Sequence, residues 1–317
     1  MAKLRLVRST WLAEGVVGLD LADPGPGAPD LPAWEPGAHL TLHLADGLCR
    51  EYSLCGDPAD RTRYTVAVQR DAASRGGSAY VHEKLRVGEI IEADGPRNNF
   101  PLQDAEAYVL IAGGIGITPI SAMVRELADR GADWRLLYCG RTRDRMPFLG
   151  ELTAAELGTG PNVTVHVDDE AGGPADLAAY LREAPDDAHV YACGPEPLLA
   201  AVENALGEAA DDRLHVERFR PPAITAPGGE ETAFDVVCGA GRFTVAPGTS
   251  ILATLLDAGL DIPYSCEEGI CGSCETDVLA GTPDHRDHLL SEAEKKAGKT
   301  MLLCVSRCRT PELVLDL

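Results

Sequence analysis

The most constraining feature of this 317-residue chain is a group of cysteines near its C-terminus. Cys266, Cys271 and Cys274 have the spacing C-x4-C-x2-C, and Cys304 follows after 29 intervening residues. Four thiolates in this three-plus-one arrangement are typical of [2Fe–2S] cluster binding. Such a loop has to fold around its cluster, so the spacing predicts a small iron–sulfur domain with these four ligands.

Three alternatives to this ligand set remain open. The first is a zinc site, although zinc usually takes two C-x2-C pairs and this loop has an x4 gap. Four unligated thiols are the second interpretation of the same cysteines. Cys308, four residues beyond Cys304, could supply the fourth ligand, although we expect it to be a bystander. Gly269 and Gly272 would let backbone N–H groups approach the cluster sulfurs.

Charge and hydropathy exclude several function classes. The chain has 28 Lys and Arg against 50 Asp and Glu, a formal net charge of −22, which argues against a nucleic-acid partner because phosphates would be repelled. Its apolar runs fall short of the roughly 18 residues of a membrane span, and the N-terminus lacks the apolar stretch of a signal peptide. We therefore expect a cytoplasmic protein, with no membrane partner, that docks on a basic protein surface.

Hydrophobic periodicity predicts a multidomain chain of three modules. Residues 1–103 contain short alternating runs such as 39–44 and 63–68, which favour an antiparallel β-barrel. From 104 to 223, apolar strands such as 108–112 alternate with helical segments such as 120–130, which indicates an α/β domain with a parallel sheet. A Pro/Gly-rich stretch at 220–229 is expected to be a linker. Residues 224–317 then form a small α+β unit around the cysteine loop.

A barrel strand ends in a motif suited to a flavin. Arg50-Glu-Tyr-Ser-Leu54 matches the R-x-Y-S pattern of the ferredoxin–NADP reductase superfamily. The resemblance implies that Arg50 neutralises a flavin phosphate, Tyr52 packs on the isoalloxazine and Ser53 bonds near flavin N5. Leu54, the next residue, is also expected to be cofactor-binding. These roles suit a permanent fork cation, an aromatic ring and a small hydroxyl. Without that resemblance, the segment would be an amphipathic strand.

The segment Gly113-Gly-Ile-Gly-Ile-Thr-Pro119 follows a predicted strand and opens a helix, so its glycines would let a pyrophosphate approach the helix N-terminus. It is the G-G-x-G-x-T-P form of the same superfamily, in which the contacts fall on Gly114, Gly116, Thr118 and Pro119. Pro119 suits the first helical turn. The plain alternative is an ordinary strand-to-helix turn.

Three further segments complete the expected nucleotide and flavin sites. Cys193-Gly194-Pro195 follows a strand, and the resemblance places this turn beside the nicotinamide; a buried structural thiol is the alternative. Arg141 begins a basic loop that could hold the 2′-phosphate of NADPH, but the resemblance favours NADH. Relatives carry an aromatic residue that stacks near flavin N5 at the position of Phe219, which could instead be a core residue.

The order of these motifs resembles the phthalate dioxygenase reductase family and its vanillate demethylase relatives over the whole chain. Gly76, Gly77 and Ser78 begin a predicted helix at 79–85 and could bind a phosphate, or could form a plain capped turn. The family resemblance favours FMN over FAD, which the residues alone do not separate. The cysteine segment 263–275 likewise resembles the cluster loop of plant-type ferredoxins.

The resemblance implies an enzyme in which NADH gives a hydride to FMN, the [2Fe–2S] cluster carries single electrons, and an oxygenase receives them. Ser53, Cys193 and Phe219 are then the expected catalytic residues, and we expect a monomer. A Rieske-type oxygenase is the favoured partner, with a cytochrome P450 as the alternative. A regulatory or redox-sensing electron-transfer subunit is the non-enzymatic alternative.

Overall fold

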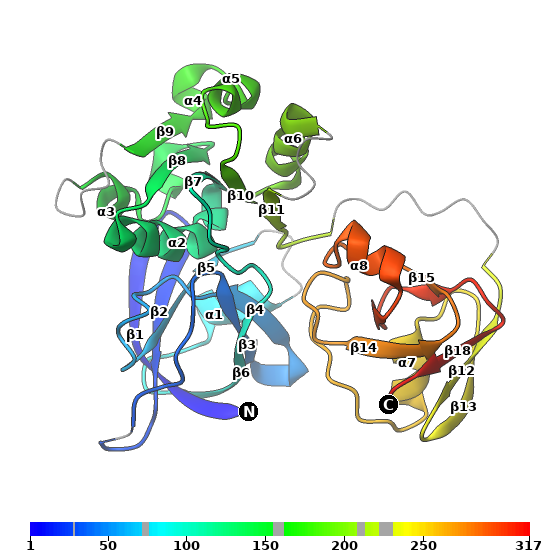
Figure 1. Cartoon of the computed structure of the whole chain (residues 1–317). Coiled ribbons are helices and arrows are strands. Elements are labelled where there is room, and N and C mark those ends of the chain that lie inside the picture. The colour runs from blue at the N-terminus through cyan, green and yellow to red at the C-terminus, as the bar shows by residue number, and fades with distance from the viewer. Residues whose placement is uncertain (28, 72–75, 155–161, 208–212, 222–230) are drawn as a thin grey trace. The chain divides into compact units, whose positions relative to one another are not determined.

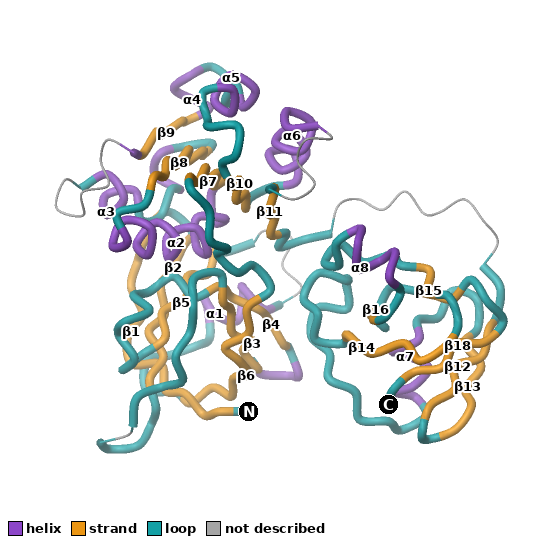
Figure 2. Tube along the Cα trace, viewed as in Figure 1, coloured by secondary structure: helices purple, strands orange, loops and turns teal. Residues whose placement is uncertain are grey.

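The computed structural model describes residues 1–27, 29–71, 76–154, 162–207, 213–221 and 231–317 (Figures 1 and 2). The chain forms two compact units, Met1–Phe219 and Arg220–Leu317. Within the described ranges, no helix is both long and apolar enough to span a bilayer.

The N-terminal half of the first unit is an antiparallel barrel. Its six strands have the order β4-β3-β6-β1-β2-β5, and an antiparallel bridge between Leu54 and Val66 joins the two edges. Alternate residues such as Leu4, Leu6 and Leu40 point inward and are almost fully buried, as the two-residue period of a strand requires. The elements are β1 (Ala2–Ala13), β2 (Val16–Ala22), β3 (Ala38–His43), η1 (Ala45–Gly47), β4 (Cys49–Ser53), β5 (Tyr64–Gln69), α1 (Gly77–Glu83) and β6 (Ile90–Asn98).

The other half of the first unit is a parallel sheet with helices on both faces. Its strand order is β11-β10-β7-β8-β9, and the central strand β7 is buried along its whole length, as expected for a covered parallel strand. One face packs on α2 and the other on α5 and α6. The elements are β7 (Ala107–Gly113), η2 (Gly114–Gly116), α2 (Ile117–Arg130), β8 (Asp133–Gly140), η3 (Arg143–Arg145), α3 (Leu149–Thr153), β9 (Val163–Val167), α4 (Asp168–Ala171), α5 (Leu177–Arg182), β10 (His189–Cys193), α6 (Glu196–Leu206) and β11 (Leu214–Glu217).

The second unit is a small α+β domain. A mixed sheet has the order β13-β12-β18-β14-β16, and β15 pairs with β17 beside it. Its core joins α7 to the sheet and reaches Cys274 and Cys304, so the cysteine loop lies against packed structure. The elements are β12 (Phe234–Cys238), β13 (Gly241–Val245), α7 (Ile251–Asp257), β14 (Glu275–Ala280), β15 (Pro283–Asp284), α8 (Glu292–Ala297), β16 (Thr300–Leu302), β17 (Arg307–Cys308) and β18 (Glu312–Leu315).

The predicted fold class is confirmed: an antiparallel barrel, a parallel α/β sheet and an α+β iron–sulfur domain follow one another along the chain. Local boundaries differ from the predictions. The helix expected at 79–85 is α1 and begins at Gly77, and the helix expected at 120–130 is α2 and begins at Ile117. The predicted linker at 220–229 and the boundary after residue 223 fall largely or wholly outside the described residues. The barrel boundary after residue 103 stays a prediction.

Candidate functional site

The carboxyl ends of the parallel strands bring two glycine turns together. A Cβ on Gly116 would lie 2.2 Å from the carbonyl oxygen of Cys193, and a Cβ on Gly194 would lie 3.0 Å from the Cα of Gly113. These glycines therefore let the turn after β7 and the turn after β10 pack backbone against backbone. Gly114 differs, because it has a φ of +54° and open space where a Cβ would stand, so it is the glycine that a ligand can approach.

The remaining residues of the first turn have structural contacts. The hydroxyl of Thr118 is buried and donates to the carbonyl of Ile115 at 3.0 Å. Pro119 lies in the first turn of α2 and is buried, where its missing N–H costs no helical hydrogen bond. The ring of Pro195 fits against Gly113, where a Cβ would lie 2.6 Å from its Cδ. The predicted nucleotide-binding residues are thus gathered at one edge of the sheet.

The carboxyl group of Glu217, a partly buried residue, joins the barrel to this edge. Glu217, the last residue of β11, accepts long contacts at the same oxygen, Oε2, from Ser53 Oγ at 3.5 Å and from Cys193 Sγ at 3.9 Å. Ser53 ends barrel strand β4, and Cys193 ends β10. Two residues expected to be catalytic, 140 positions apart in the sequence, therefore meet at one carboxyl group.

Burial sets the protonation of this group. It raises the pKa of Glu217 to about 8, helped by the charge of Glu51 and opposed by the hydrogen bonds from Ser53 and Cys193. Burial, with Glu217 nearby, raises the pKa of the Cys193 thiol well above its usual range. At neutral pH the site therefore holds a neutral thiol and a largely neutral carboxylic acid, which can both donate protons in hydrogen bonds.

Sequence reasoning missed Glu217, although a signal was present. The residue ends a strand of the parallel sheet, and ligands of such sheets bind outside the carboxyl ends of the strands. Phe219 is 38% exposed.

The R-x-Y-S residues lie where barrel strand β4 passes the first turn of α1. The side chain of Arg50 covers Gly77, where a Cβ would lie 2.5 Å from its Cγ, and its guanidinium donates to the carbonyl of Cys49 at 2.7 Å. Gly76 has a φ of +97°, a conformation that glycine adopts without strain. A fork cation thus lies beside backbone N–H groups, a donor set that fits a flavin phosphate.

The other residues of the predicted flavin site make contacts within the barrel and its neighbouring loop. Tyr52 packs against the barrel core, and burial raises the pKa of its hydroxyl to about 12. Leu54 is completely buried in the core, and its N–H donates to the carbonyl of Ala38 at 2.8 Å. The Ser78 hydroxyl accepts a hydrogen bond from the N–H of Asp71 at 3.1 Å.

The basic loop after β8 is exposed and partly neutralised. Arg143 Nε and Nη2 donate to the two carboxylate oxygens of Glu170 at 2.8 and 2.7 Å. Arg141 accepts at its carbonyl from the N–H of Asp169 at 3.2 Å. Acidic residues at the end of β9 therefore face this loop, where a 2′-phosphate would meet them as well as the arginines.

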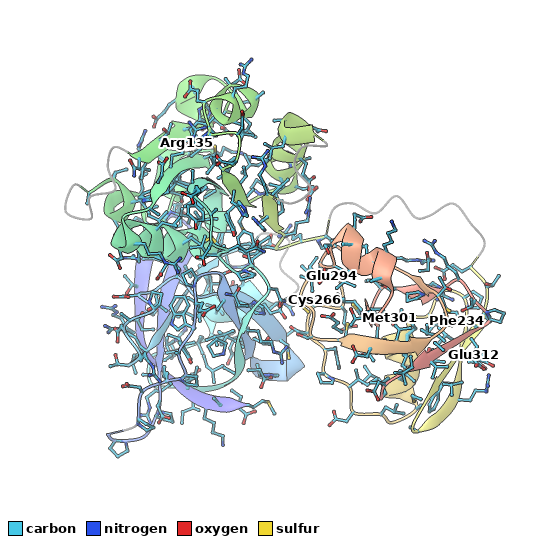
Figure 3. The ribbon with its side chains drawn as sticks, viewed as in Figure 1. Arg135, Phe234, Cys266, Glu294, Met301 and Glu312 are labelled. Carbon is cyan, nitrogen blue, oxygen red and sulfur yellow. The ribbon has the colours of Figure 1, made fainter. Side chains whose placement is uncertain are left out.

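The second unit gathers the four predicted cluster ligands, among which Cys266 is labelled in Figure 3. Cys266 forms thiol contacts with Cys271 and Cys304, and Cys274 forms one with Cys304. Hydrogen bonds from Cys271 and Cys304 hold the pKa of Cys266 well below its usual range.

Backbone donors surround these sulfurs. The N–H of Glu268 lies 3.3 Å from Cys266 Sγ, and the N–H of Ser273 lies 3.5 Å from Cys271 Sγ. Gly269 has a φ of +71°, and a Cβ there would lie 2.6 Å from a methyl group of Val305. Converging soft thiolates with N–H donors fit a [2Fe–2S] cluster. Cys308 is elsewhere: its sulfur lies 3.1 Å from the hydroxyl of Thr310.

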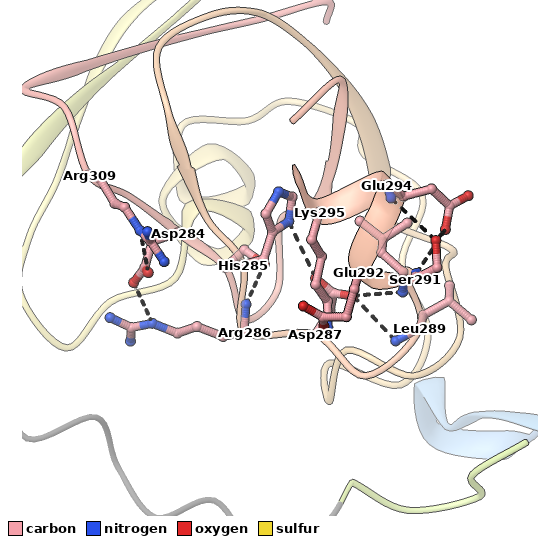
Figure 4. A network of polar contacts seen from close by, with 12 residues as sticks. Asp284, His285, Arg286, Asp287, Leu289, Ser291, Glu292, Glu294, Lys295 and Arg309 are labelled. Atoms are coloured by element: carbon pink, nitrogen blue, oxygen red, sulfur yellow. Dashed lines mark hydrogen bonds and ion pairs between the residues drawn. The ribbon is translucent and has the colours of Figure 1, made fainter. Parts of the chain in front are cut away.

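The polar network drawn in Figure 4 includes the segment that contacts the cysteine loop. The Asp287 carboxylate is completely buried and accepts from the N–H groups of Leu289 and Leu290 at 3.3 and 2.8 Å. Its Cα lies 3.2 Å from where Gly269 would carry a Cβ, and the N–H of His288 donates to the carbonyl of Gly269 at 2.9 Å. The segment 287–290 thereby holds the backbone of the cysteine loop.

Comparisons with known proteins agree with this arrangement. Residues 110–204 match the family model of the oxidoreductase NAD-binding domain, and residues 236–309 match that of the 2Fe-2S iron-sulfur cluster binding domain. The chain is 43% identical over 316 residues to phenoxybenzoate dioxygenase subunit beta of Ectopseudomonas oleovorans, which covers 99% of this chain and 97% of that protein. It is 38% identical over 322 residues to phthalate dioxygenase reductase of Burkholderia cepacia, with the same coverage.

Solved structures give the same result. A structure of phthalate dioxygenase reductase covers 99% of this chain and 97% of that one, with 37% identity and a TM-score of 0.72. An intact type IV self-sufficient cytochrome P450 monooxygenase covers all of this chain with 40% identity and a TM-score of 0.91, but this chain matches only 41% of its length. The chain therefore belongs to the phthalate dioxygenase reductase family, the oxidoreductases that combine NADH, FMN and a [2Fe–2S] cluster in the reductase component of an oxygenase system.

Proposed function

We propose that this chain accepts a hydride from NADH at the junction of Ser53, Cys193 and Glu217, and delivers single electrons to a Rieske-type oxygenase. The observation that carries the proposal is the meeting of these three side chains, which come from the barrel and from two strands of the parallel sheet. FMN would supply the conversion of a two-electron donor into one-electron steps. The protein groups orient the reactants and exclude water.

Each residue near this junction has a role that suits its chemistry. Arg50 would hold the flavin phosphate, because its guanidinium lies over Gly77. Ser53 would direct its hydroxyl toward flavin N5. Cys193, with a neutral and polarizable sulfur, would contact the nicotinamide without adding charge. Glu217 would keep both side chains oriented, and Phe219 would stack on the flavin near N5 before the nicotinamide binds.

We propose NADH rather than NADPH as the electron donor. Arg143, the central arginine of the basic loop, already pairs with both carboxylate oxygens of Glu170. A 2′-phosphate would have to displace this carboxylate and would meet the neighbouring negative charge of Asp168 and Asp169. The uncharged 2′-hydroxyl of NADH makes no such demand.

In the second unit, Cys266, Cys271, Cys274 and Cys304 would hold the cluster, which fits their convergence and the N–H groups near their sulfurs. The negative chain, with exposed Glu267 beside the loop, favours docking on a basic protein face. We further propose that the chain works as a cytoplasmic monomer.

A cytochrome P450 is the second candidate partner, because the similar P450 monooxygenase contains a segment like this chain in the same polypeptide. The deciding experiment couples the purified holoprotein and NADH separately to a Rieske-type oxygenase and to a P450, and measures product against NADH consumed. Tight coupling to the Rieske-type enzyme supports the proposal. Efficient coupling to the P450 alone would replace it with the second candidate.

The hydride site has its own test. Rapid mixing with NADH should show slower flavin bleaching in Glu217→Gln, whereas Glu203→Gln, which changes a partner of Arg218 on α6, should bleach at the normal rate. Equal rates in the two variants would remove Glu217 from the proposed site and leave the electron-transfer function intact.

A further inference from the structure

Three side chains outside the hydride site form a chain of hydrogen bonds on the barrel. Cys49, His43 and Asp94 come from the neighbouring strands β4, β3 and β6. The sulfur of Cys49 lies 3.2 Å from Nδ1 of His43, and Nε2 of His43 lies 2.7 Å from Oδ2 of Asp94. A thiol, an imidazole and a carboxylate in this order have the connectivity of an activated nucleophile, its base and the group that orients the base.

The carboxylate decides which imidazole nitrogen faces the thiol. Burial opposes ionisation of Asp94, but the hydrogen bonds from His43 and from the Met1 amino group hold its pKa below the usual range. An ionised carboxylate only accepts hydrogen bonds, so Nε2 of His43 has to carry the proton. In the neutral ring, Nδ1 then has a free lone pair directed at the Cys49 thiol. His43 is therefore set to receive the thiol proton.

The thiol needs such a base and can be reached. Burial raises the pKa of Cys49; Asp94 and Glu51 act in the same direction, and Arg50 opposes them. The residue is nevertheless only half-buried, and the side chains of His43 and Asp94 are 28% and 27% exposed. His43 also lines an open groove of about 460 Å³ on the barrel surface.

We propose that Cys49 is a site of reversible oxidation by hydrogen peroxide, with His43 as its base and Asp94 as the residue that positions the base. The sulfur attacks one peroxide oxygen, an S–O bond forms and the O–O bond breaks. His43 takes the thiol proton and passes it to the departing oxygen, so the products are Cys49 sulfenic acid and one water. Sulfur loses two electrons, peroxide gains them, and an added thiol such as glutathione restores the residue through a disulfide.

The test measures the modification directly in the holoprotein. Peroxide is added with the sulfenic acid trap dimedone, and peptide mass spectrometry follows the labelling rate of each cysteine. Cys238 is the matched control, because it is also a half-buried thiol at a strand end. In the wild type, we expect Cys49 to be labelled at least about tenfold faster than Cys238. In His43→Gln, labelling of Cys49 should be roughly 100-fold slower than in the wild type, which is the low end of the effect of a positioned base.

Asp94→Asn should give an intermediate labelling rate, because the imidazole then lacks a strong acceptor to orient it. Flavin and cluster absorbance report whether each variant is folded, and the comparison of Cys49 with Cys238 in the wild type needs no variant. Labelling of Cys49 at the rate of Cys238, or an unchanged rate in a folded His43→Gln protein, would overturn the proposal.

Discussion

At the scale of single residues, burial changes the protonation state of Glu217 at neutral pH. The carboxyl group lies between a serine hydroxyl and a thiol and has a pKa of about 8. It can therefore donate a hydrogen bond at pH 7 but mainly accepts above pH 8. The proposed alignment of Ser53 and Cys193 depends on this group. The rate of hydride transfer should therefore depend on whether Glu217 is protonated.

We predict that the flavin reduction rate of the wild type changes as the pH passes about 8, and that Glu217→Gln removes this dependence because the amide does not ionise. Stopped-flow reduction by NADH between pH 6 and 9.5 measures it. A wild-type profile that is flat across this range contradicts the assignment.

The same group makes a prediction about stability. In the unfolded chain Glu217 loses its proton near pH 4.5, whereas the folded flavin-free protein keeps it to about pH 8. Between these values the unfolded state binds fewer protons, so the free energy of unfolding falls as the pH rises. The slope is at most about 1.4 kcal/mol per pH unit, and less here because the side chain is partly exposed. Urea unfolding at pH 5 and pH 8 measures this for the wild type and Glu217→Gln. The free energy of unfolding of the wild type minus that of the variant should be smaller at pH 8 than at pH 5, or change sign.

The proposed cluster ligands can be tested by replacing single sulfur atoms. Cys304→Ser should abolish or cripple cluster assembly, because a hard oxygen replaces a soft thiolate. Cys308→Ser should keep the visible spectrum, since its sulfur contacts Thr310 and a backbone carbonyl instead. Iron content and visible absorbance of the two purified variants measure this, and cluster loss in the Cys308 variant alone would exchange the two assignments.

At the scale of elements, the turn after β7 and the turn after β10 behave as one unit. Gly116 has Cys193 backbone atoms within 2.4 Å of the place where a Cβ would stand. Both turns end strands of the same sheet, so neither can retreat without disturbing the ladder that joins β7 to β10. The glycines thus determine the distance between the two turns proposed to bind the nucleotide.

Gly116→Ala should lower the free energy of unfolding by about 1–3 kcal/mol, the usual cost of overpacking a rigid site, and should weaken NADH binding. Gly150→Ala is the matched control: Gly150 lies in α3 with nothing within 4 Å of a new Cβ, so the substitution should be neutral or slightly stabilising. Chemical unfolding of both variants measures the effect. Equal stabilities would mean that the turns can separate without cost.

At the scale of the whole molecule, the chain divides into two compact units, Met1–Phe219 and Arg220–Leu317. The residues proposed for the flavin and NADH all lie in the first unit, and the four cysteines proposed for the cluster lie in the second. Hydride transfer and single-electron delivery are therefore assigned to separable parts of one polypeptide.

A chain that ends at Arg220 should keep flavin and NADH-dependent reduction of a small quinone, because the hydride site is complete. It should lose nearly all reduction of cytochrome c or of an oxygenase, which need the cluster. Steady-state assays of the truncated and full-length proteins separate the two activities. Undiminished delivery to the oxygenase would rule out the serial path from flavin to cluster to partner.

The net charge of −22 should attract the basic surface of the proposed oxygenase partner. Raising the ionic strength to 0.15 M shortens the Debye length to about 8 Å, so the apparent affinity for a basic oxygenase should fall. NADH-dependent reduction of the quinone should change much less, since it needs no protein partner. Titration of the oxygenase at several salt concentrations measures this, and salt-independent affinity would exclude electrostatic docking.

The features that could be predicted from the sequence are those that lie close together along it. The cysteine loop places three proposed ligands within nine residues, and the Gly113–Pro119 turn lies between a recognisable strand and helix. Periodicity of two and of 3.6 residues was enough to predict the barrel and the α/β sheet. Such patterns are local, so the physics that produces them can be interpreted without knowing the partners of each strand.

The meetings of distant residues were decided by the tertiary structure. The barrel strand β4 ends where β10 and β11 end, so Ser53 meets Cys193 and Glu217. Strand β3 pairs with β4 on one side and with β6 on the other, so His43 lies between Cys49 and Asp94. Shifting a strand by one residue turns its side chains to the opposite face of the sheet. The protonation of Glu217 also follows from burial, which depends on how the whole unit packs, so no local pattern could have predicted it.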